Sequence, residues 1–335
     1  MSHQGRGLHK LAQKLHDEFP DTPTLTLARR LYKENSKDFP SLEAARNSLR
    51  YVRGTTGKHN RQKRGLKAPL KKGYAGQQPA LPPTEAKEWK PVVLKLPCKV
   101  LCLSDLHIPY HSEIAVNAAV EWGMEHQPDV IVLNGDVADF YTISRWEKDP
   151  NARNFVAETD AIEQTLEWLQ RCFPDARKIY MEGNHEERYT KYIWQKAPEL
   201  WGVDNVRIQE ILHVADYGFE YIDGKRPVMA GKMCIMHGHE INAHGGVNPA
   251  RTAFLRTSTS VLIGHLHRTS THAESDMWHS ETVTFSQGCL CDLRPEYCRV
   301  SNKWNWGFAF VAAEKDGQFD VTNLRISKQG HVRTA

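Results

Sequence analysis

Five short apolar segments, each followed at once by glycine and polar residues, constrain this chain more than any other feature of its sequence. The segments span 100–103, 130–133, 178–181, 233–236 and 261–263. Apart from Lys178 they are apolar, and they are rich in β-favouring residues, which is typical of strands buried on both faces. After the second segment, apolar residues recur every three or four positions from Phe155 to Leu169, which predicts a helix with one buried face. This alternation predicts an α/β domain.

The polar clusters behind these segments contain residue types that bind divalent metals through oxygen and nitrogen. Because functional groups converge at the carboxyl edge of an α/β sheet, we expect the five clusters to lie together. Carboxylates and imidazoles suit Mn²⁺, Zn²⁺ or iron, and two such ions roughly 3.5–4 Å apart activate water and polarise a phosphoryl group. Each cluster alone is also typical of an ordinary turn, but five in this order indicate a two-metal hydrolytic site. The clusters are Asp105-Leu106-His107, Gly135-Asp136, Gly183-Asn184-His185-Glu186, His237-Gly238 and Gly264-His265-Leu266-His267.

Length and charge indicate more than one domain. The chain has 335 residues, enough for one large and one small domain. Residues 1–72 contain 17 lysines and arginines and 6 acidic residues, whereas the rest of the chain contains 27 and 34. Proline and glycine recur between 66 and 96, with little apolar periodicity. We therefore expect a basic helical domain over 1–65, a linker over 66–96 and an α/β domain over 97–335.

The basic domain is expected to contain two helices that present cations. One helix is predicted over 24–34 and a second from 42 to about 53, with Ser41 as its N-cap and Gly54 at its end. A helix-turn-helix-like pair of this kind suits the phosphate backbone of nucleic acid, most of all DNA. The alternative is that the basic face docks on the acidic remainder of the chain. Candidate contacts to nucleic acid are Arg46, Arg50, Arg53, Lys58, Arg61 and Arg64.

Composition also indicates the cellular compartment of the protein. No apolar stretch reaches the roughly 20 residues that span a bilayer, and the N-terminus lacks the apolar segment of a secretory signal. We therefore expect a cytoplasmic protein without membrane contact. The seven cysteines show no Cys-x-x-Cys spacing. Cys289, Cys291 and Cys298 are close enough in sequence to hold a metal or form a disulfide, although reduced thiols are the usual state inside cells.

Over about residues 98–270, the five clusters resemble the calcineurin-like metallophosphoesterase family. They match its Asp-x-His, Gly-Asp-x-x-Asp, Gly-Asn-His-Glu, His-Gly and Gly-His-x-His motifs. The resemblance implies two β-sheets packed as a sandwich and flanked by helices, with two divalent ions at one rim, Mn²⁺ foremost, or Zn²⁺, iron or Mg²⁺. It also implies a role for each site residue: Asp105, His107 and His267 bind one ion, Asn184, His237 and His265 bind the other, Asp136 bridges both, and His185 contacts the phosphate and assists the leaving group.

The resemblance further implies the reaction, in which a hydroxide bridging the two ions attacks phosphorus in line. No covalent enzyme intermediate is expected, and the chain contains neither a Gly-x-Ser-x-Gly elbow nor a phosphate-binding P-loop motif. Phosphoprotein phosphatases of the wider group differ from this chain around the first two motifs. Here Ile108 follows Asp105-Leu106-His107, and Asp139-Phe140-Tyr141 closes the second motif. A protein phosphatase is therefore not expected.

A second resemblance is to phage and prophage metallophosphoesterases that are often described as DNA exonucleases. It rests on residues 27–34, 50–54, 287–290 and 304–308. Tyr297, Trp304 and Trp306 would stack on bases in such an enzyme, or pack within the domain. We therefore expect a phosphodiesterase or nuclease that acts on DNA. The alternatives are an enzyme for small nucleotides or cyclic nucleotides, and an inactive scaffold that keeps the fold.

Overall fold

The chain divides by its internal contacts into two compact units, Met1–Glu85 and Ala86–Ala335, which we call the N-terminal unit and the α/β unit. The structure, a computed structural model, describes residues 3–56, 81–86, 88, 90–144, 154–223, 226–242, 246–295 and 301–335. Several predictions fall on residues outside these ranges, namely residues 66–80 of the linker, Lys58, Arg61, Arg64, Tyr297 and Cys298.

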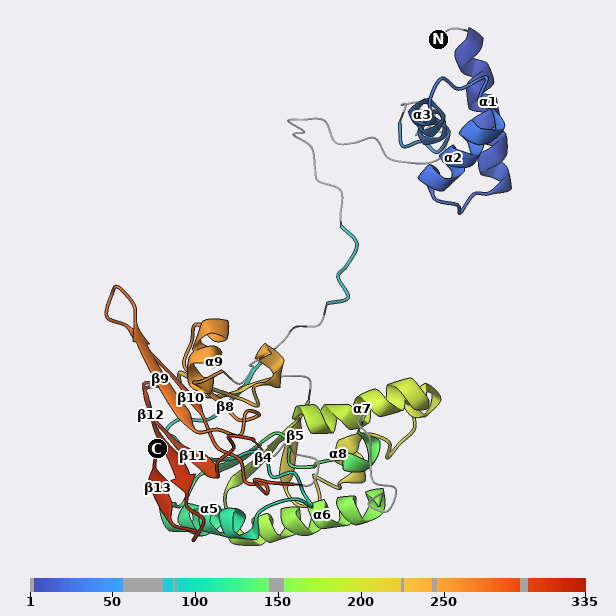
Figure 1. Ribbon diagram of the computed structural model, residues 1–335. Helices are drawn as coiled ribbons and strands as arrows, with labels where there is room; N and C mark the ends of the chain where they lie inside the picture. The colour runs from blue at the N-terminus through green and yellow to red at the C-terminus, as the bar shows by residue number, and fades with distance from the viewer. Residues whose placement is uncertain are drawn as a thin grey trace. The chain divides into compact units, whose positions relative to one another are not determined.

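The described part of the N-terminal unit contains three helices (Figure 1): α1 (His3–Glu18), α2 (Thr24–Glu34) and α3 (Leu42–Val52). The helix α2 has the predicted bounds, and α3 ends within one residue of its expected end. The Ser41 side chain accepts a hydrogen bond from the Ala44 N–H, which confirms the predicted N-cap. Leu27 and Leu31 are buried between the helices. The connection over residues 35–41 is seven residues long, whereas a helix-turn-helix motif uses about three or four.

A mixed seven-stranded sheet forms one half of the α/β unit. In order across the sheet, its strands are β13 (Val332–Thr334), β12 (Phe319–Ile326), β11 (Gly307–Ala313), β2 (Cys98–Leu103), β3 (Val130–Asn134), β4 (Arg177–Met181) and β5 (Phe219–Ile222). The strands from β2 to β5 run parallel, and β11 pairs antiparallel with β2. The strands β11 and β12 pair in antiparallel register and form a hairpin around Asp316-Gly317.

A six-stranded sheet forms the other half of this unit. In order, its strands are β1 (Val92–Val93), β6 (Val228–Ala230), β7 (Met233–Met236), β8 (Val261–Ile263), β10 (Glu281–Ser286) and β9 (Ser270–Ser275). The strands β7, β8 and β10 run parallel. All five apolar segments are strands, three in the first sheet and two in the second. The short strand β1 lies within the range predicted as linker and pairs with β6.

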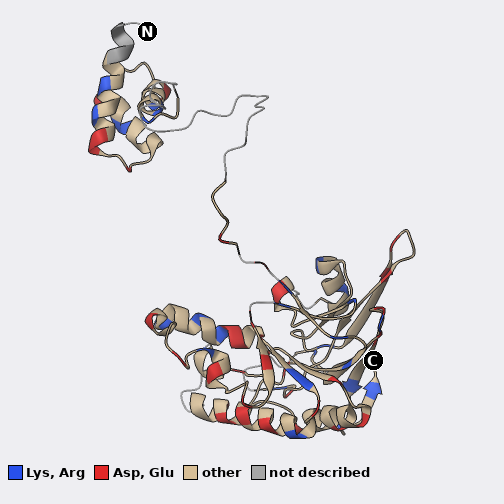
Figure 2. Cartoon of the chain, turned by 180° about the vertical axis from the view of Figure 1, so that it is seen from behind, with Lys and Arg blue, Asp and Glu red and all other residues tan. Residues whose placement is uncertain are grey.

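Helices cover the outer face of each sheet (Figure 1). The helices α5 (Glu113–His126) and α6 (Phe155–Cys172) pack on the seven-stranded sheet, and α9 (Pro249–Thr257) packs on the six-stranded sheet. Acidic residues recur along α6 (Figure 2), whose buried face carries Ile162 and Leu169 as the apolar spacing predicts. Two sheets flanked by helices confirm the expected fold. The remaining elements are η1 (Tyr141–Ile143), α7 (Asn184–Lys196), η3 (Pro198–Leu200), α8 (Ile208–Ile211) and η4 (His239–Ile241).

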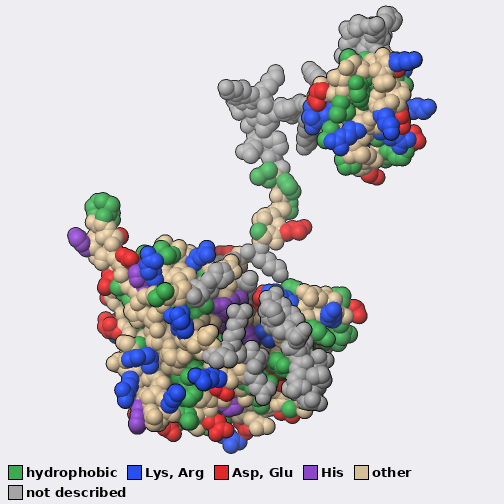
Figure 3. Space-filling view, viewed as in Figure 1, with side chains coloured by type: hydrophobic (Ala, Val, Ile, Leu, Met, Phe, Trp, Pro, Cys, Tyr) green, Lys and Arg blue, Asp and Glu red, His purple; other side chains and the backbone are tan. Residues whose placement is uncertain are grey.

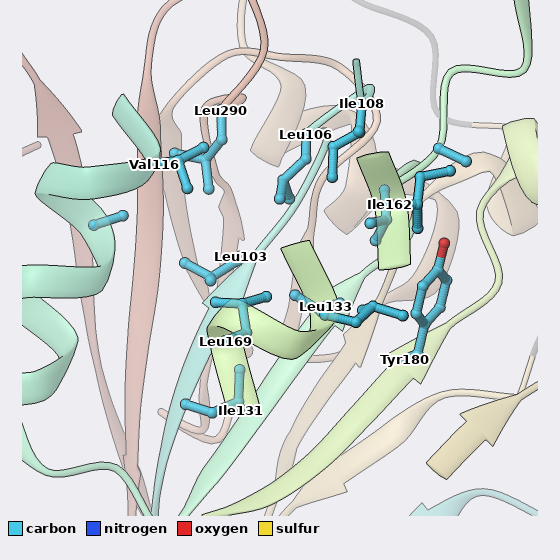
Figure 4. Packing of buried hydrophobic residues seen from close by; sticks show 14 of the residues in the cluster. Leu103, Leu106, Ile108, Val116, Ile131, Leu133, Ile162, Leu169, Tyr180 and Leu290 are labelled. Atoms are coloured by element: carbon cyan, nitrogen blue, oxygen red, sulfur yellow. The ribbon is translucent and has the colours of Figure 1, made fainter. Parts of the chain in front are cut away.

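Apolar side chains fill the space on both faces of the seven-stranded sheet. On one face, Leu103 and Leu133 pack against Ile162 and Leu169 of α6 (Figure 4). On the other face, Cys102 belongs to the cluster that lies between the two sheets. Because successive strand residues point to opposite faces, β2 contributes to both cores. This explains why residues 100–103 of the strand are apolar without interruption, whereas Lys99 near its start is exposed.

Candidate metal centre

The loops after β2, β3 and β4 meet the loops after β7 and β8 at one rim of the sandwich. Parallel strands place their carboxyl ends at the same edge, and backbone hydrogen bonds then join the loops. The Asp105 N–H donates to Gly135 O (3.1 Å), and the Gly264 N–H donates to His237 O (2.8 Å). Histidine side chains gather near the middle of this unit's face in Figure 3. Every predicted metal-site residue lies in these loops or at the start of α7.

Asp105, His107 and His267 form one side of the cluster. The Nε2 atoms of His107 and His267 lie 3.2 Å apart. His267 Nε2 lies 3.1 Å from Asp105 Oδ1. All three side chains are buried. The structure therefore brings together the three residues that the resemblance assigns to a single ion.

Asp136, Asn184, His237 and His265 form the other side. His237 Nε2 lies 3.2 Å from Asp136 Oδ2 and 3.3 Å from Asn184 Oδ1. The ring centroids of His237 and His265 are 5.1 Å apart. Asp136 Oδ2 also lies 3.9 Å from His107 Nε2, so this carboxylate faces both groups.

The backbone of these loops adopts a conformation that side chains of L-residues rarely allow. Five of the residues have φ in the left-handed region: Asp105 (56°), His107 (49°), Asp136 (51°), His265 (62°) and His267 (55°). Non-glycine residues with positive φ are uncommon and concentrate at functional sites, where surrounding contacts hold the strained backbone in place. The strained backbone therefore lies in the same loops that carry the oxygen and nitrogen donor atoms.

Three histidines are each held through Nδ1, the ring nitrogen that faces away from the cluster. His107 Nδ1 contacts Asp139 Oδ1 (2.9 Å), His185 Nδ1 contacts Asp139 O (2.7 Å), and His237 Nδ1 contacts Asn134 O (2.7 Å). A hydrogen-bond partner at the nitrogen that does not bind metal sets the tautomer and the orientation of a metal-binding imidazole. The motifs do not indicate the contact with Asn134, because it uses a backbone carbonyl that any residue at this position would supply.

Glu186 has a structural function that the sequence analysis missed. Its side chain is fully buried and accepts hydrogen bonds from four backbone N–H groups and one hydroxyl group. A glutamate in the first turn of α7, directly after the Gly-Asn-His cluster, was the available signal for this contact. The donors are the N–H groups of Asp136 (3.1 Å), Val137 (2.9 Å), Ala138 (3.0 Å) and Gly183 (2.9 Å) and the Tyr180 hydroxyl (2.9 Å).

The histidines of the cluster differ in protonation. Burial opposes the charged form of His237 and His267, but Asp136 raises the pKa of His237 to about 10 and Asp105 raises that of His267, so a metal ion would replace a proton on each of these rings. Burial lowers the pKa of His185 to about 3 and that of His265 to about 4, so both rings are neutral near pH 7. Burial opposes ionisation of Asp105, but the neighbouring His267 lowers the pKa of Asp105 to about 2. Asp136 keeps its pKa well below the ordinary value in the same way, through nearby histidines.

The donor set fits two divalent ions. Within the described parts of the chain, the ion pairs of Asp105 and Asp136 are all with histidines rather than with lysine or arginine. Buried carboxylates of this kind need a cation or a proton as partner. Oxygen and nitrogen donors together suit Mn²⁺, Zn²⁺ or iron.

Two hollows adjoin the cluster, one beside Asn184 and His185 and the other beside His265. The first measures about 780 Å³ and runs along α7, with Asn184, His185, Arg188, Lys191 and Tyr192 among its lining residues. The second measures about 580 Å³, with His265, Arg268, Lys303 and Trp304 among its lining residues. Both hollows therefore combine a proposed ligand with cationic and aromatic side chains.

The two described tryptophans near the site differ in their surroundings. The Trp304 ring centroid lies 4.2 Å from that of His267, at the edge of the second hollow. The Trp306 ring packs against the buried core, and its Nε1–H donates to Cys291 O (2.8 Å). Trp306 therefore packs within the domain.

The nucleic-acid candidates that the structure describes, Arg46, Arg50 and Arg53, are already engaged with neighbouring groups. Arg46 and Arg50 each lie 3.3 Å from a carboxylate oxygen of Glu43 on the surface of α3. Arg53 donates to Thr22 O (2.7 Å) and so anchors the end of α3 to the connection between α1 and α2. Other cations of this unit, Lys10, Lys14, Arg29 and Lys33, are exposed.

The calcineurin-like phosphoesterase family matches residues 98–298, which is more than half of the chain. The chain belongs to this family and is therefore a metal-dependent phosphoesterase. Similar curated proteins include the Gene 54 protein of Mycobacterium phage L5, which is 26% identical over 255 residues, covering 70% of this chain and 98% of the phage protein. The Gene 54 protein of Mycobacterium phage D29 is 26% identical over 254 residues, with the same coverage.

Solved structures similar to this chain include wild-type Vps29 complexed with zinc from Entamoeba histolytica, with a TM-score of 0.38 and 12% identity over 71% of this chain and 97% of that one. The phosphoesterase Yfce from E. coli has a TM-score of 0.33 and 16% identity over 66% of this chain and 96% of that one. None of the described helices combines the length and apolar character that crossing a bilayer demands.

Proposed function

We propose that the chain is a phosphodiesterase that hydrolyses DNA with two bound divalent ions, Mn²⁺ foremost. The observation that carries the proposal is the position of Asp136, whose carboxylate belongs to both groups of donor atoms. The proposed ligands are Asp105, His107 and His267 for one ion, Asn184, His237 and His265 for the other, and Asp136 between them.

When bound, the ions polarise the phosphoryl group and lower the pKa of water at the site. The chain itself supplies positioned groups around the phosphate. His185 is held through Nδ1 by Asp139 O, and its Nε2 lies 3.9 Å from Asp136 Oδ2. From this place Nε2 contacts a phosphoryl oxygen or the leaving oxygen of a bound ester. Because most of the proposed ligands are buried and held in place, little reorganisation accompanies the reaction.

A polymeric substrate is supported by the two hollows beside the cluster. A strand whose scissile phosphate lies at the cluster has nucleotides on either side, and each hollow offers groups that bind them. Arg188 and Lys191 suit phosphates in one hollow, and Trp304 suits a base in the other. The exposed cations of the N-terminal unit give further support, because they suit the DNA backbone.

Hydrolysis assays with Mn²⁺ test the proposal on single-stranded DNA, double-stranded DNA, bis(p-nitrophenyl) phosphate and p-nitrophenyl phosphate. We expect cleavage of DNA and of the small diester, and loss of both in Asp136→Asn. Asp160→Asn, on the exposed side of α6, is the matched control and should keep activity. Hydrolysis of the monoester alone would instead identify an enzyme for small phosphoesters. Inactivity with Mn²⁺, Zn²⁺, iron and Mg²⁺ would identify a scaffold.

A further inference from the structure

The ring of His267 is held differently from the other histidines of the centre. His107, His185 and His237 each direct Nδ1 at an oxygen atom. His267 Nδ1 instead lies 3.8 Å from the sulfur of Cys291. A sulfur atom thus occupies the position that a carboxylate or carbonyl oxygen takes at the other three rings.

The two nitrogens of His267 face different partners. Its Nε2 lies 3.1 Å from Asp105 Oδ1 and 3.2 Å from His107 Nε2, inside the cluster. The sulfur of Cys291 contacts the opposite nitrogen, Nδ1, and also lies within 4.8 Å of a ring nitrogen of His107. A thiol at this place can orient the ring, whereas the proposed ion is bound through Nε2.

The position of Cys291 is well determined by its neighbours. Its carbonyl oxygen accepts the Trp306 Nε1–H (2.8 Å), and its backbone forms an isolated β-bridge with His111. Its side chain is buried and is not part of a disulfide. The segment that follows β10 therefore places the Cys291 thiol, with the Cys289 thiol beside it, against His267.

We propose that Cys291 is a positioning residue for His267. Its sulfur accepts the Nδ1–H, which selects the tautomer with the Nε2 lone pair directed at the ion shared with Asp105 and His107. The inference rests on the proposed metal centre and adds a residue that no motif of the chain contains. Sulfur is a weaker hydrogen-bond acceptor than oxygen. The ion bound through His267 is therefore held less firmly than the ion bound through His237.

Metal affinity measured by competition with a chromophoric chelator tests the proposal without any substrate. In the full-length protein, Cys291→Ala should lower the affinity for one of the two ions by about 10- to 100-fold. This is the usual effect of removing a hydrogen-bond partner of a metal ligand. Cys291→Ser should restore part of the affinity, because a hydroxyl oxygen also accepts the Nδ1–H. Cys102→Ala removes an equally buried thiol from the sandwich interior and should leave both affinities unchanged.

Two spectroscopic readouts separate positioning from other roles. Nitrogen-15 NMR of labelled histidines in the zinc-loaded protein should show His267 protonated at Nδ1, and a mixture of tautomers in Cys291→Ala. The cobalt-loaded protein should lack a sulfur-to-cobalt charge-transfer band. A band that disappears in Cys291→Ala would make the sulfur a direct ligand and overturn the proposal. Equal affinities in Cys291→Ala and Cys102→Ala would overturn it as well.

His267→Ala distinguishes failure of this inference from failure of the proposed centre. If His267→Ala binds both ions with unchanged affinity, the proposed ligand set is wrong. If His267→Ala loses one ion while Cys291→Ala keeps it, the ligand set stands and the positioning role of Cys291 fails.

Discussion

Among single residues, Glu186 does most to hold the strained loops of the site together. Its carboxylate is the shared acceptor for the backbone after β3 and for Gly183. In Glu186→Gln, the side-chain amide would turn an NH₂ group toward these donors and leave buried N–H groups without a partner, at about 1–3 kcal/mol each. We expect the free energy of unfolding of the α/β unit to fall by about 2–4 kcal/mol, measured by urea titration.

Tyr180→Phe is the matched control for this prediction. It removes only the hydroxyl that donates to Glu186 (2.9 Å) and keeps the buried ring. The loss should be about 1 kcal/mol, the usual net value of one hydrogen bond. If both variants unfold at the same urea concentration as the natural chain, Glu186 does not hold the loops.

Glu158 makes stability depend on pH. Burial, and then the negative charge of Asp139, raise the pKa of this carboxyl from 4.5 to about 7. Because the folded chain binds the proton more tightly than the unfolded chain, the stabilisation is complete below about pH 4.5 and is lost as pH rises through about 7. Glutamine resembles the protonated acid but does not ionise. We therefore expect Glu158→Gln to remove up to about 3 kcal/mol of the change in the free energy of unfolding with pH.

Urea titrations at intervals from pH 5 to 8 check the prediction on Glu158. The difference between the natural chain and Glu158→Gln should grow as pH rises, because only the natural chain loses its proton there. Other groups titrate equally in both proteins and cancel in the comparison. A constant difference across this range would show that Glu158 ionises normally.

At the level of elements, the sequence predicted the strands well because a buried strand has a local pattern of apolar residues. The proposed ligands rest on local motifs as well, because they come just after such strands, as Asp105 comes after β2. The outer partners depend on tertiary contacts instead. Cys291 lies 24 residues from His267 and reaches it only through the path of the chain after β10. No local pattern marks such a contact.

The segment before β11 is expected to contribute to substrate binding through Trp304. A base stacked on an aromatic side chain is worth about 1–3 kcal/mol, or roughly 5- to 150-fold in affinity. We expect Trp304→Ala to lower kcat/KM on single-stranded DNA within this range and to leave hydrolysis of bis(p-nitrophenyl) phosphate nearly unchanged. Steady-state kinetics on both substrates measure the effect.

Two further variants make the prediction on Trp304 specific. Trp304→Phe keeps an aromatic face and should recover part of the lost kcat/KM. Trp278→Ala removes a tryptophan that is 77% exposed on the turn between β9 and β10. This variant should leave kcat/KM unchanged on both substrates. If Trp304→Ala slows hydrolysis of both substrates equally, the ring holds His267 in place rather than stacking on a base.

For the whole molecule, the uneven distribution of charge suggests that the two units have different functions. Residues 1–72 carry an excess of basic residues, and the remainder carries an excess of acidic ones. An acidic unit repels a polyanion, so a basic unit on the same chain raises the affinity for DNA without taking part in the reaction. The site needs only the α/β unit, because all its proposed ligands belong to that unit. DNA binding and hydrolysis are therefore expected to be separable by mutation.

Replacement of Lys10, Lys14, Arg29 and Lys33 by glutamine tests this separation. For duplex DNA, each lost phosphate contact should lower the slope of log affinity against log salt by about 0.9, while bis(p-nitrophenyl) phosphate hydrolysis stays unchanged. Binding titrations from low to high salt measure the slope. Arg46→Gln with Arg50→Gln is the comparison: Glu43 already pairs with both charges, so the slope should fall less per residue. An unchanged slope in the fourfold variant would mean that this face binds no DNA.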